Sequence, residues 1–260
     1  MIKWWGNKNR DVLTMFFYFF VLGLIIGSFL NVCIYRMPKN ESVVFPSSHC
    51  PHCRTKLASW DLVPLFSYLW LKGRCRYCQC PISWRYPVVE LLTGLLFIAL
   101  YAYFGLNLLL VKYLTLICLL MVISFIDLEY YLIPNRLILV ISGAGVLLNF
   151  FTRELTISSI IWGVLAPAGI LFLLAALSKG GMGGGDIKLA GAAGLFLGWP
   201  QSLLALFLAC FLGGFFGLIL LIFRLKKRKD PLPFAPFLSG GIIFTVFFGQ
   251  ALLKWYFSQW

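Results

Sequence analysis

The sequence predicts an all-α polytopic membrane protein with about eight transmembrane helices and a zinc-ribbon-like cytoplasmic loop. Two observations support this fold class: 61% of the 260 residues are apolar, and only 12% are charged. A soluble domain carries roughly a quarter charged residues and about 45–50% apolar ones. A single core in water could not bury this many apolar side chains. A soluble globule, a disordered chain and a coiled coil are therefore excluded.

Apolar stretches of membrane-spanning length recur along the chain. A helix needs about 20 apolar residues to cross the hydrocarbon layer. The first stretch, 12–34, is too long for the apolar part of a signal peptide and ends without a small-residue cleavage site, so we expect a retained span. The others are 87–104, 110–126, 135–151, 157–177, 187–199, 201–223 and 236–256, of which 187–199 is short and rich in glycine.

Three regions follow from this pattern. Residues 1–34 hold the first span, residues 35–85 form a loop that we expect to be hydrophilic, and residues 86–260 form the transmembrane core. Eight spans place both termini on one side of the membrane. The side of the loop carries sixteen of the 22 lysines and arginines, and the other side carries six. Because cations are enriched in cytoplasmic loops, we expect this loop in the cytoplasm.

The net charge of +13 has the same origin. Most cations lie in short gaps between apolar stretches, where membrane topology and anionic lipid account for them. Nucleic acid is therefore not an expected partner, whereas the lipid bilayer is.

Four cysteines of the loop have the spacing of a zinc site. Cys50 and Cys53 form one C-x-x-C pair, and Cys75 and Cys78 form a second one. Four thiolates complete a tetrahedral Zn²⁺ shell and leave no position open for water, so we expect a structural ion. A reducing cytoplasm disfavours disulfides, although unliganded thiols or a redox pair remain alternatives. Other residues close enough to replace a ligand are Cys80, His49 and His52.

Two of the nine acidic residues lie at the ends of predicted spans. Asp127 ends the apolar run 119–126, and Asp186 follows a run of glycines. An ionisable side chain at membrane depth is costly and is a functional candidate by default. Asp127 could instead be solvated at the interface, and Asp186 could be the N-cap of the helix that follows.

The glycines before Asp186 favour a role in chemistry. Gly183, Gly184 and Gly185 lack Cβ atoms, so an extended peptide can approach the backbone closely. Two carboxylates in a site of low dielectric constant cannot both ionise; one keeps a proton and polarises a carbonyl, and the other activates water. The residues alone leave an aspartic hydrolase and a proton- or cation-coupled transporter as alternatives, with an inactive zinc-ribbon scaffold as a third.

Five segments in this order resemble the type IV prepilin peptidases, a family of polytopic aspartic endopeptidases of bacterial plasma membranes. The segments are Gly27-Ser28-Phe29-Leu30-Asn31-Val32 with Tyr35-Arg36, the four-cysteine loop, Ser83-Trp84-Arg85-Tyr86-Pro87 with Glu90-Leu91, Phe125-Ile126-Asp127 with Ile133-Pro134-Asn135, and Met182-Gly183-Gly184-Gly185-Asp186-Ile187-Lys188. Together they cover most of the chain.

This resemblance implies an activity and a set of partners. Asp127 and Asp186 would be the catalytic pair, facing the cytoplasm, with the three glycines and Lys188 in a supporting loop. Substrates would be type IV prepilins or pseudopilins, whose short basic leaders are removed after a glycine. The resemblance also implies methylation of the new N-terminus with S-adenosylmethionine, although the sequence contains no glycine-rich loop of the Rossmann kind.

Four further polar residues are candidates for contacts with the substrate or for a part in methyl transfer. Glu129 is expected to contact the basic leader, or else to be solvated at the interface. Glu90 is either a buried partner of Arg36 or Lys188, or an acid favoured by the dipole at a helix start. Asn31 and Arg36 are expected to orient the loop against the first span, or to be the polar end of a helix.

Overall fold

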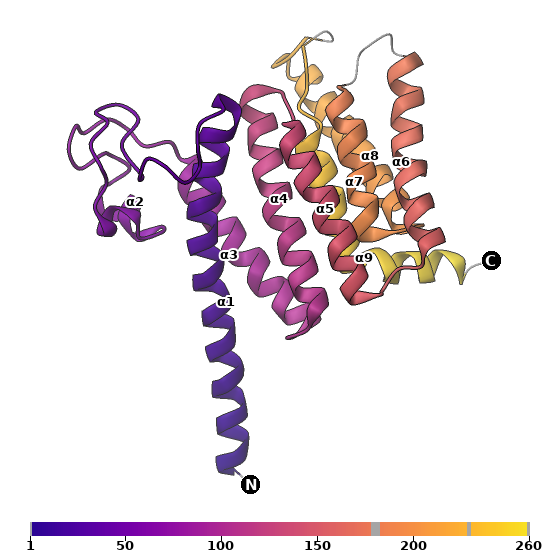
Figure 1. Ribbon diagram of the computed structural model, residues 1–260, viewed down its shortest axis with the longest axis horizontal. Helices are drawn as coiled ribbons and strands as arrows, with labels where there is room; N and C mark the ends of the chain where they lie inside the picture. The colour runs from indigo at the N-terminus through magenta and orange to yellow at the C-terminus, as the bar shows by residue number, and fades with distance from the viewer. Residues whose placement is uncertain (1, 178–182, 228–229, 259–260) are drawn as a thin grey trace. The chain divides into compact units, whose positions relative to one another are not determined.

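The computed structural model describes residues 2–177, 183–227 and 230–258 (Figure 1). In these ranges the chain is built from helices and loops, and the only strand-like features are two isolated β-bridges. The chain divides into two compact units, Met1–Leu110 and Val111–Trp260. Met182 of the glycine segment lies outside the described ranges, as do Lys179, Arg228 and Lys229, three of the sixteen cations on the side of the loop.

Seven described helices are long and apolar enough to cross a membrane, which confirms the predicted fold class. They are α1 (Ile2–Arg36), α3 (Arg85–Phe104), α4 (Leu108–Tyr130), α5 (Asn135–Thr152), α6 (Ile157–Leu177), α8 (Gln201–Ile222) and α9 (Ala235–Phe257). The remaining predicted stretch, 187–199, is α7 (Gly184–Leu197), a helix of only 14 residues. At 1.5 Å per residue such a helix is about 21 Å long, short of the roughly 30 Å hydrocarbon layer.

In the first unit, α1 and α3 pack against each other in antiparallel directions. A Cβ atom placed on Gly27 would lie 2.8 Å from Cα of Glu90, so the two backbones approach as closely as only a glycine permits. One turn further along α1, Nδ2 of Asn31 donates hydrogen bonds to the carbonyls of Gly27, at 3.3 Å, and of Tyr86, at 3.1 Å. These contacts fix the register of the two helices near the loop.

The loop between α1 and α3 contains three short helices and the cysteine pairs. The helices are η1 (Met37–Lys39), η2 (Ser59–Leu62) and α2 (Phe66–Trp70). The expectation of a uniformly hydrophilic loop is wrong. Residues 62–71 are almost entirely apolar, and Phe66 and Trp70 expose 70% and 84% of their surface.

In the second unit, α7 is a central helix that packs against α5, α6, α8 and α9. It is buried nearly all round, because small residues line it and neighbouring backbones can approach. A Cβ atom on Gly194 would collide with the backbone of Gly163 in α6. This close packing holds a short helix, with Asp186 in its first turn, in the middle of longer ones.

Candidate active site and zinc centre

Asp127 lies in the last turn of α4 and is held by the start of α9. Its side chain is only 5% exposed, and Oδ2 accepts a hydrogen bond of 3.0 Å from the backbone amide of Ala235. Ala235 is the first residue of α9, so the carboxylate meets the positive end of that helix. One turn earlier, Oγ of Ser124 and Oγ of Ser239 are 2.7 Å apart, which fixes the same two helices together.

Asp186 lies in the first turn of α7, the short helix that is not among the seven of membrane length. Its backbone amide donates to the carbonyl of Gly183, at 3.1 Å, which makes Gly183 the N-cap of the helix. Oδ1 of Asp186 is buried and has no hydrogen-bond partner within the described ranges. Burial, and after it the charge of nearby Asp127, raises the pKa of Asp186 to about 6.

The start of α7 packs against the chain that follows α4. A Cβ atom on Gly185, the glycine directly before Asp186, would lie 2.9 Å from Cβ of Ile133. The absence of a side chain at Gly185 therefore permits this close approach. Two residues beyond Asp186, Nζ of Lys188 donates to Oδ1 of Asn135 at 2.9 Å. For Gly184, by contrast, no atom of the described residues lies within 4 Å of the position that a Cβ atom would take. The structure thus brings both aspartates to neighbouring helix ends.

This arrangement suits a pair that shares one proton. Two carboxylates within electrostatic reach, one buried and one half-buried, cannot both ionise without a large cost, so the pair holds one proton until the pH rises through the pKa of Asp186 at about 6. The protonated member can polarise a carbonyl, and the ionised member can accept a proton from water. Sequence reasoning missed the amide of Ala235, because nothing in a sequence marks a backbone donor 108 residues from the acid it holds.

The four loop cysteines form one cluster in the first unit. The Sγ atoms of Cys50, Cys53, Cys75 and Cys78 all lie within 4.8 Å of one another. Sγ of Cys50 and Sγ of Cys78 are 3.8 Å apart. A tetrahedral ion with Zn–S bonds of about 2.3 Å places its sulfurs about 3.8 Å apart, so the cluster fits Zn²⁺.

Each cysteine pair sits in the same type of turn. The amide of Arg54 donates to the carbonyl of Cys50, and the amide of Gln79 donates to the carbonyl of Cys75, at 2.9 and 3.0 Å. Arg54 and Gln79 both have a left-handed backbone, with φ of 56° and 59°. The two turns therefore present their thiols in matching ways. Cys80, His49 and His52 contribute no atom to the cluster.

The polar candidates of the first unit make contacts with the loop. Arg36 donates from its guanidinium to the carbonyls of Ser42 and Ser47, at 3.0 and 3.4 Å. Oε2 of Glu90 accepts from the amide of Leu65 at 2.9 Å, so its partner is a loop backbone group and not Arg36. Oδ1 of Asn31 is buried and has no hydrogen-bond partner in the described part of the chain, and the side chain has no exposed surface.

Glu129 lies in the last turn of α4, two residues after Asp127. Its side chain is exposed, in contrast to Asp127. Residues two apart on a helix point in different directions, so Glu129 does not share the face that carries Asp127.

Comparisons with known proteins agree across both units. Residues 21–104 match the family described as bacterial peptidase A24 N-terminal domain, and residues 114–218 match the type IV leader peptidase family. Curated proteins named prepilin leader peptidase/N-methyltransferase are similar over nearly the whole chain. The one from Bacillus subtilis is 36% identical over 92% of this chain and 97% of its own length. Those from Aeromonas hydrophila and Legionella pneumophila are each 34% identical, over 92% and 94% of this chain and 93% and 96% of their own lengths. No solved structure matches.

Proposed function

The chain belongs to the type IV leader peptidase family, and we propose that it is a membrane aspartic endopeptidase that removes the leaders of type IV prepilins or pseudopilins. As a multi-pass bacterial membrane protein it would act at the inner membrane, with its site toward the cytoplasm. The observation that carries the proposal is the pair of carboxylates, buried Asp127 and half-buried Asp186, at adjoining helix ends.

The proposed reaction uses the shared proton of this pair. The ionised carboxylate takes a proton from water as the oxygen attacks the scissile carbonyl, and the protonated one donates a hydrogen bond to the carbonyl oxygen. The tetrahedral intermediate collapses when a carboxyl proton passes to the leaving amine. The amide of Ala235 keeps one carboxylate oxygen occupied, which leaves the other oxygen of Asp127 for water. The proposed cut follows a glycine.

Leader recognition is proposed to involve Glu129. The leader carries positive charge, and Glu129 is an exposed acid in the same helical turn as Asp127. Glu129→Gln should raise KM for a basic leader with little change in kcat. A leader whose lysines are replaced by glutamine should lose this difference, which separates a charge contact from a structural effect.

The dyad is tested by replacing each aspartate with asparagine. Asp127→Asn and Asp186→Asn should each abolish cleavage of a purified precursor in proteoliposomes, while the protein still inserts and binds zinc. Asp230→Asn is the matched control, because Asp230 is exposed and accepts a hydrogen bond from the amide of Lys227, a residue outside the proposed dyad. Wild-type turnover by either dyad variant would overturn the assignment.

A proton-coupled transporter is the rival use of the same aspartates, and the relatives' names do not favour it. A transporter would drive pH-dependent solute uptake into vesicles and leave a pilin-like precursor uncut. A gel-shift assay of the co-expressed precursor separates the two functions.

We further propose that the enzyme N-methylates the new N-terminus, as the relatives' names say of those proteins. The methyl donor would be S-adenosylmethionine, which supplies an electrophilic methyl group. One observation fits a ligand with an amino group: Oδ1 of Asn31 is a buried acceptor for which the described residues offer no hydrogen-bond donor. Asn31 would hold an amine there, and Arg36 and Glu90 would hold the loop beside it.

Mass spectrometry of the processed substrate tests this assignment. Asn31→Leu should lower methylation at least tenfold and leave the cleaved fraction unchanged, and it should also weaken binding of the donor measured by calorimetry. Equal loss of cleavage and methylation would mean that Asn31 serves only the packing of α1 on α3.

A further inference from the structure

The zinc loop contains an apolar segment that neither peptide cleavage nor zinc binding uses. This segment, residues 62–71, reads Leu-Val-Pro-Leu-Phe-Ser-Tyr-Leu-Trp-Leu and lies between the two cysteine pairs. Its large side chains point away from the protein. The exposed fractions are 40% for Leu62, 44% for Val63, 70% for Phe66, 71% for Leu69 and 84% for Trp70. A surface facing water seldom leaves so many large apolar side chains together.

The segment is hydrogen-bonded to the side of a membrane-length helix. The amide of Leu65 is hydrogen-bonded to Oε2 of Glu90, the sixth residue of α3, about 7.5 Å along that helix from its start. Glu90 in turn lies against Gly27, nine residues before the end of α1. Nine residues correspond to about 13.5 Å of helix. Leu65 is therefore held beside the apolar parts of α1 and α3, and Figure 1 shows α2 beside the body of α1, not past its end.

The backbone of the segment is arranged as an apolar environment requires. Polar backbone groups in lipid must be satisfied within the protein. The amides of Ser67, Leu69 and Leu71 donate to carbonyls within the segment, at 2.9 to 3.0 Å. The amide of Leu65 precedes α2 and cannot be satisfied by that helix, and the buried carboxylate of Glu90 accepts it. Leu65 has φ of 60°, a conformation that needs such external support in a leucine.

The charges around the segment match a membrane surface. The loop residues nearest to it carry exposed cations, among them Lys56, Lys72 and Arg74. The acid of this part of the loop, Asp61, is paired with Arg76 at 2.8 Å. Apolar and aromatic side chains flanked by cations fit the boundary between acyl chains and anionic headgroups.

We propose that residues 62–71 dip into the bilayer leaflet as a lipid-facing segment, and that Glu90 sets its depth by holding the Leu65 amide. The occupant of this apolar face is lipid. Because a cysteine pair lies on each side of the segment in sequence, its insertion holds the zinc centre against the membrane surface. The carboxylate of Glu90 is a positioning group in this arrangement, which accounts for an acid buried in a membrane helix.

Tryptophan quenching in the full-length protein tests the proposal. The protein is placed in nanodiscs of phosphatidylcholine and phosphatidylglycerol with bromine on the acyl chains near the headgroup. The fluorescence of Trp70 is obtained by subtracting the emission of the Trp70→Phe variant from that of the wild type. We expect brominated lipid to quench most of this Trp70 fluorescence, and acrylamide in the water to quench little of it.

Two controls calibrate the measurement. Trp162→Phe removes an exposed side chain of the membrane-length helix α6, and its difference signal should be quenched by brominated lipid. Tyr77→Trp in the Trp70→Phe background places a fluorophore on the second cysteine turn, where lipid bromine should not reach it.

Two further variants test whether the hydrogen bond from Leu65 to Glu90 sets the position of the segment in the bilayer. Glu90→Gln keeps a hydrogen-bond acceptor for the Leu65 amide and should preserve quenching of Trp70. Glu90→Leu removes the acceptor, so acrylamide should quench Trp70 more strongly and brominated lipid should quench it less. Trp70 quenched by acrylamide and not by lipid bromine in the wild type would overturn the proposal. So would protection of Trp70 that appears only when a prepilin is added, because the face would then dock the substrate.

Discussion

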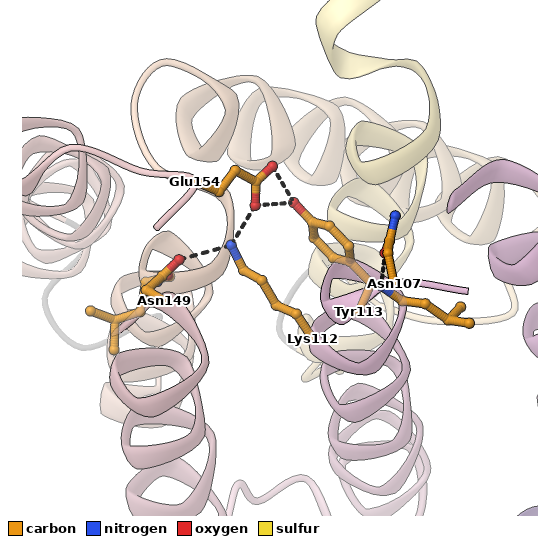
Figure 2. A network of polar contacts seen from close by, with 7 residues as sticks. Asn107, Lys112, Tyr113, Asn149 and Glu154 are labelled. Carbon is orange, nitrogen blue, oxygen red and sulfur yellow. Dashed lines mark hydrogen bonds and ion pairs between the residues drawn. The ribbon is translucent and has the colours of Figure 1, made fainter. Parts of the chain in front are cut away.

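Nζ of Lys112 and Oε2 of Glu154 form an ion pair of 2.8 Å in which the lysine side chain has no exposed surface (Figure 2). Lys112 belongs to α4 and Glu154 follows α5. The same Nζ donates to Oδ1 of Asn149 at 2.9 Å, and Nδ2 of Asn149 donates to the carbonyl of Leu195 in α7. The network thus ties α4, α5 and α7 at the ends opposite Asp127 and Asp186, the two acids that α4 and α7 carry.

Breaking this ion pair should destabilise the second unit. Removal of one partner of a buried pair costs about 3–5 kcal/mol, and Glu154 is 26% exposed, so we expect the low end for Lys112→Met. The double variant Lys112→Met with Glu154→Gln should cost less than the sum of the two single changes. Thermal unfolding in detergent measures both, and strict additivity would show that the pair does not couple.

The two acids should impose a pH dependence on activity and stability. The pKa of Asp186 is raised to about 6 from an ordinary value of about 4, so its carboxyl group binds a proton more tightly in the folded state than in the unfolded state. The stabilisation is full below pH 4 and is lost as the pH rises through about 6. Turnover should fall over the same alkaline limb, because the pair then loses its shared proton.

Melting temperatures and cleavage rates from pH 4 to 8 check this dependence. Asp186→Asn cannot titrate, so its melting temperature should lose this component of the pH dependence while that of the wild type keeps it. A wild-type rate that stays constant across this range would contradict a shared proton.

Metal removal should loosen the loop and leave Asp127 and Asp186 in place. Cys75→Ser should abolish stoichiometric zinc in the purified protein and make residues 50–80 sensitive to protease, because the metal supplies folding free energy to a small loop. Cys80→Ser is the matched control and should retain one zinc per chain, since Cys80 lies outside the cluster. Loss of zinc in the control and not in Cys75→Ser would reverse the ligand assignment.

A single methyl group added at Gly194 in α7 should lower both stability and turnover. Gly194→Ala would place Cβ against the backbone of Gly163, and overpacking of this kind costs about 1–3 kcal/mol. Because α7 carries Asp186, turnover should fall as well. Gly143→Ala meets no atom within 4 Å and should leave stability and turnover near wild type. Unfolding in detergent and precursor cleavage measure the contrast.

The sequence sufficed for the helices because each one is set by a local apolar run. The predicted stretches 135–151 and 157–177 differ by a residue at most from α5 and α6. The spacing of Cys50, Cys53, Cys75 and Cys78 was equally informative, since the ligands of one zinc ion must lie near one another in space. Asp127 and Asp186 could be selected because an acid is rare in an apolar chain.

Long-range partners could not be predicted in the same way. The partner of Glu90 is the backbone amide of Leu65, which has no signature in sequence, and Arg36 and Lys188 were the cations expected there. Lys112 was counted only as a topology signal, because its partners Asn149 and Glu154 meet it through helix packing. The apolar residues 62–71 were visible in the sequence, but their shortness hid them in a search for spans of about 20 residues.

The bond between the amide of Ala235 and the carboxylate of Asp127 makes the final helix a functional part of the second unit. A gene product that stopped before residue 235 would keep both acids, the glycines and all four zinc thiols. It would nevertheless leave Asp127 without its donor and Ser124 without Ser239. Such a shortened protein should be an inert relative that keeps both acids and all four cysteines, because it lacks the helix that holds Asp127.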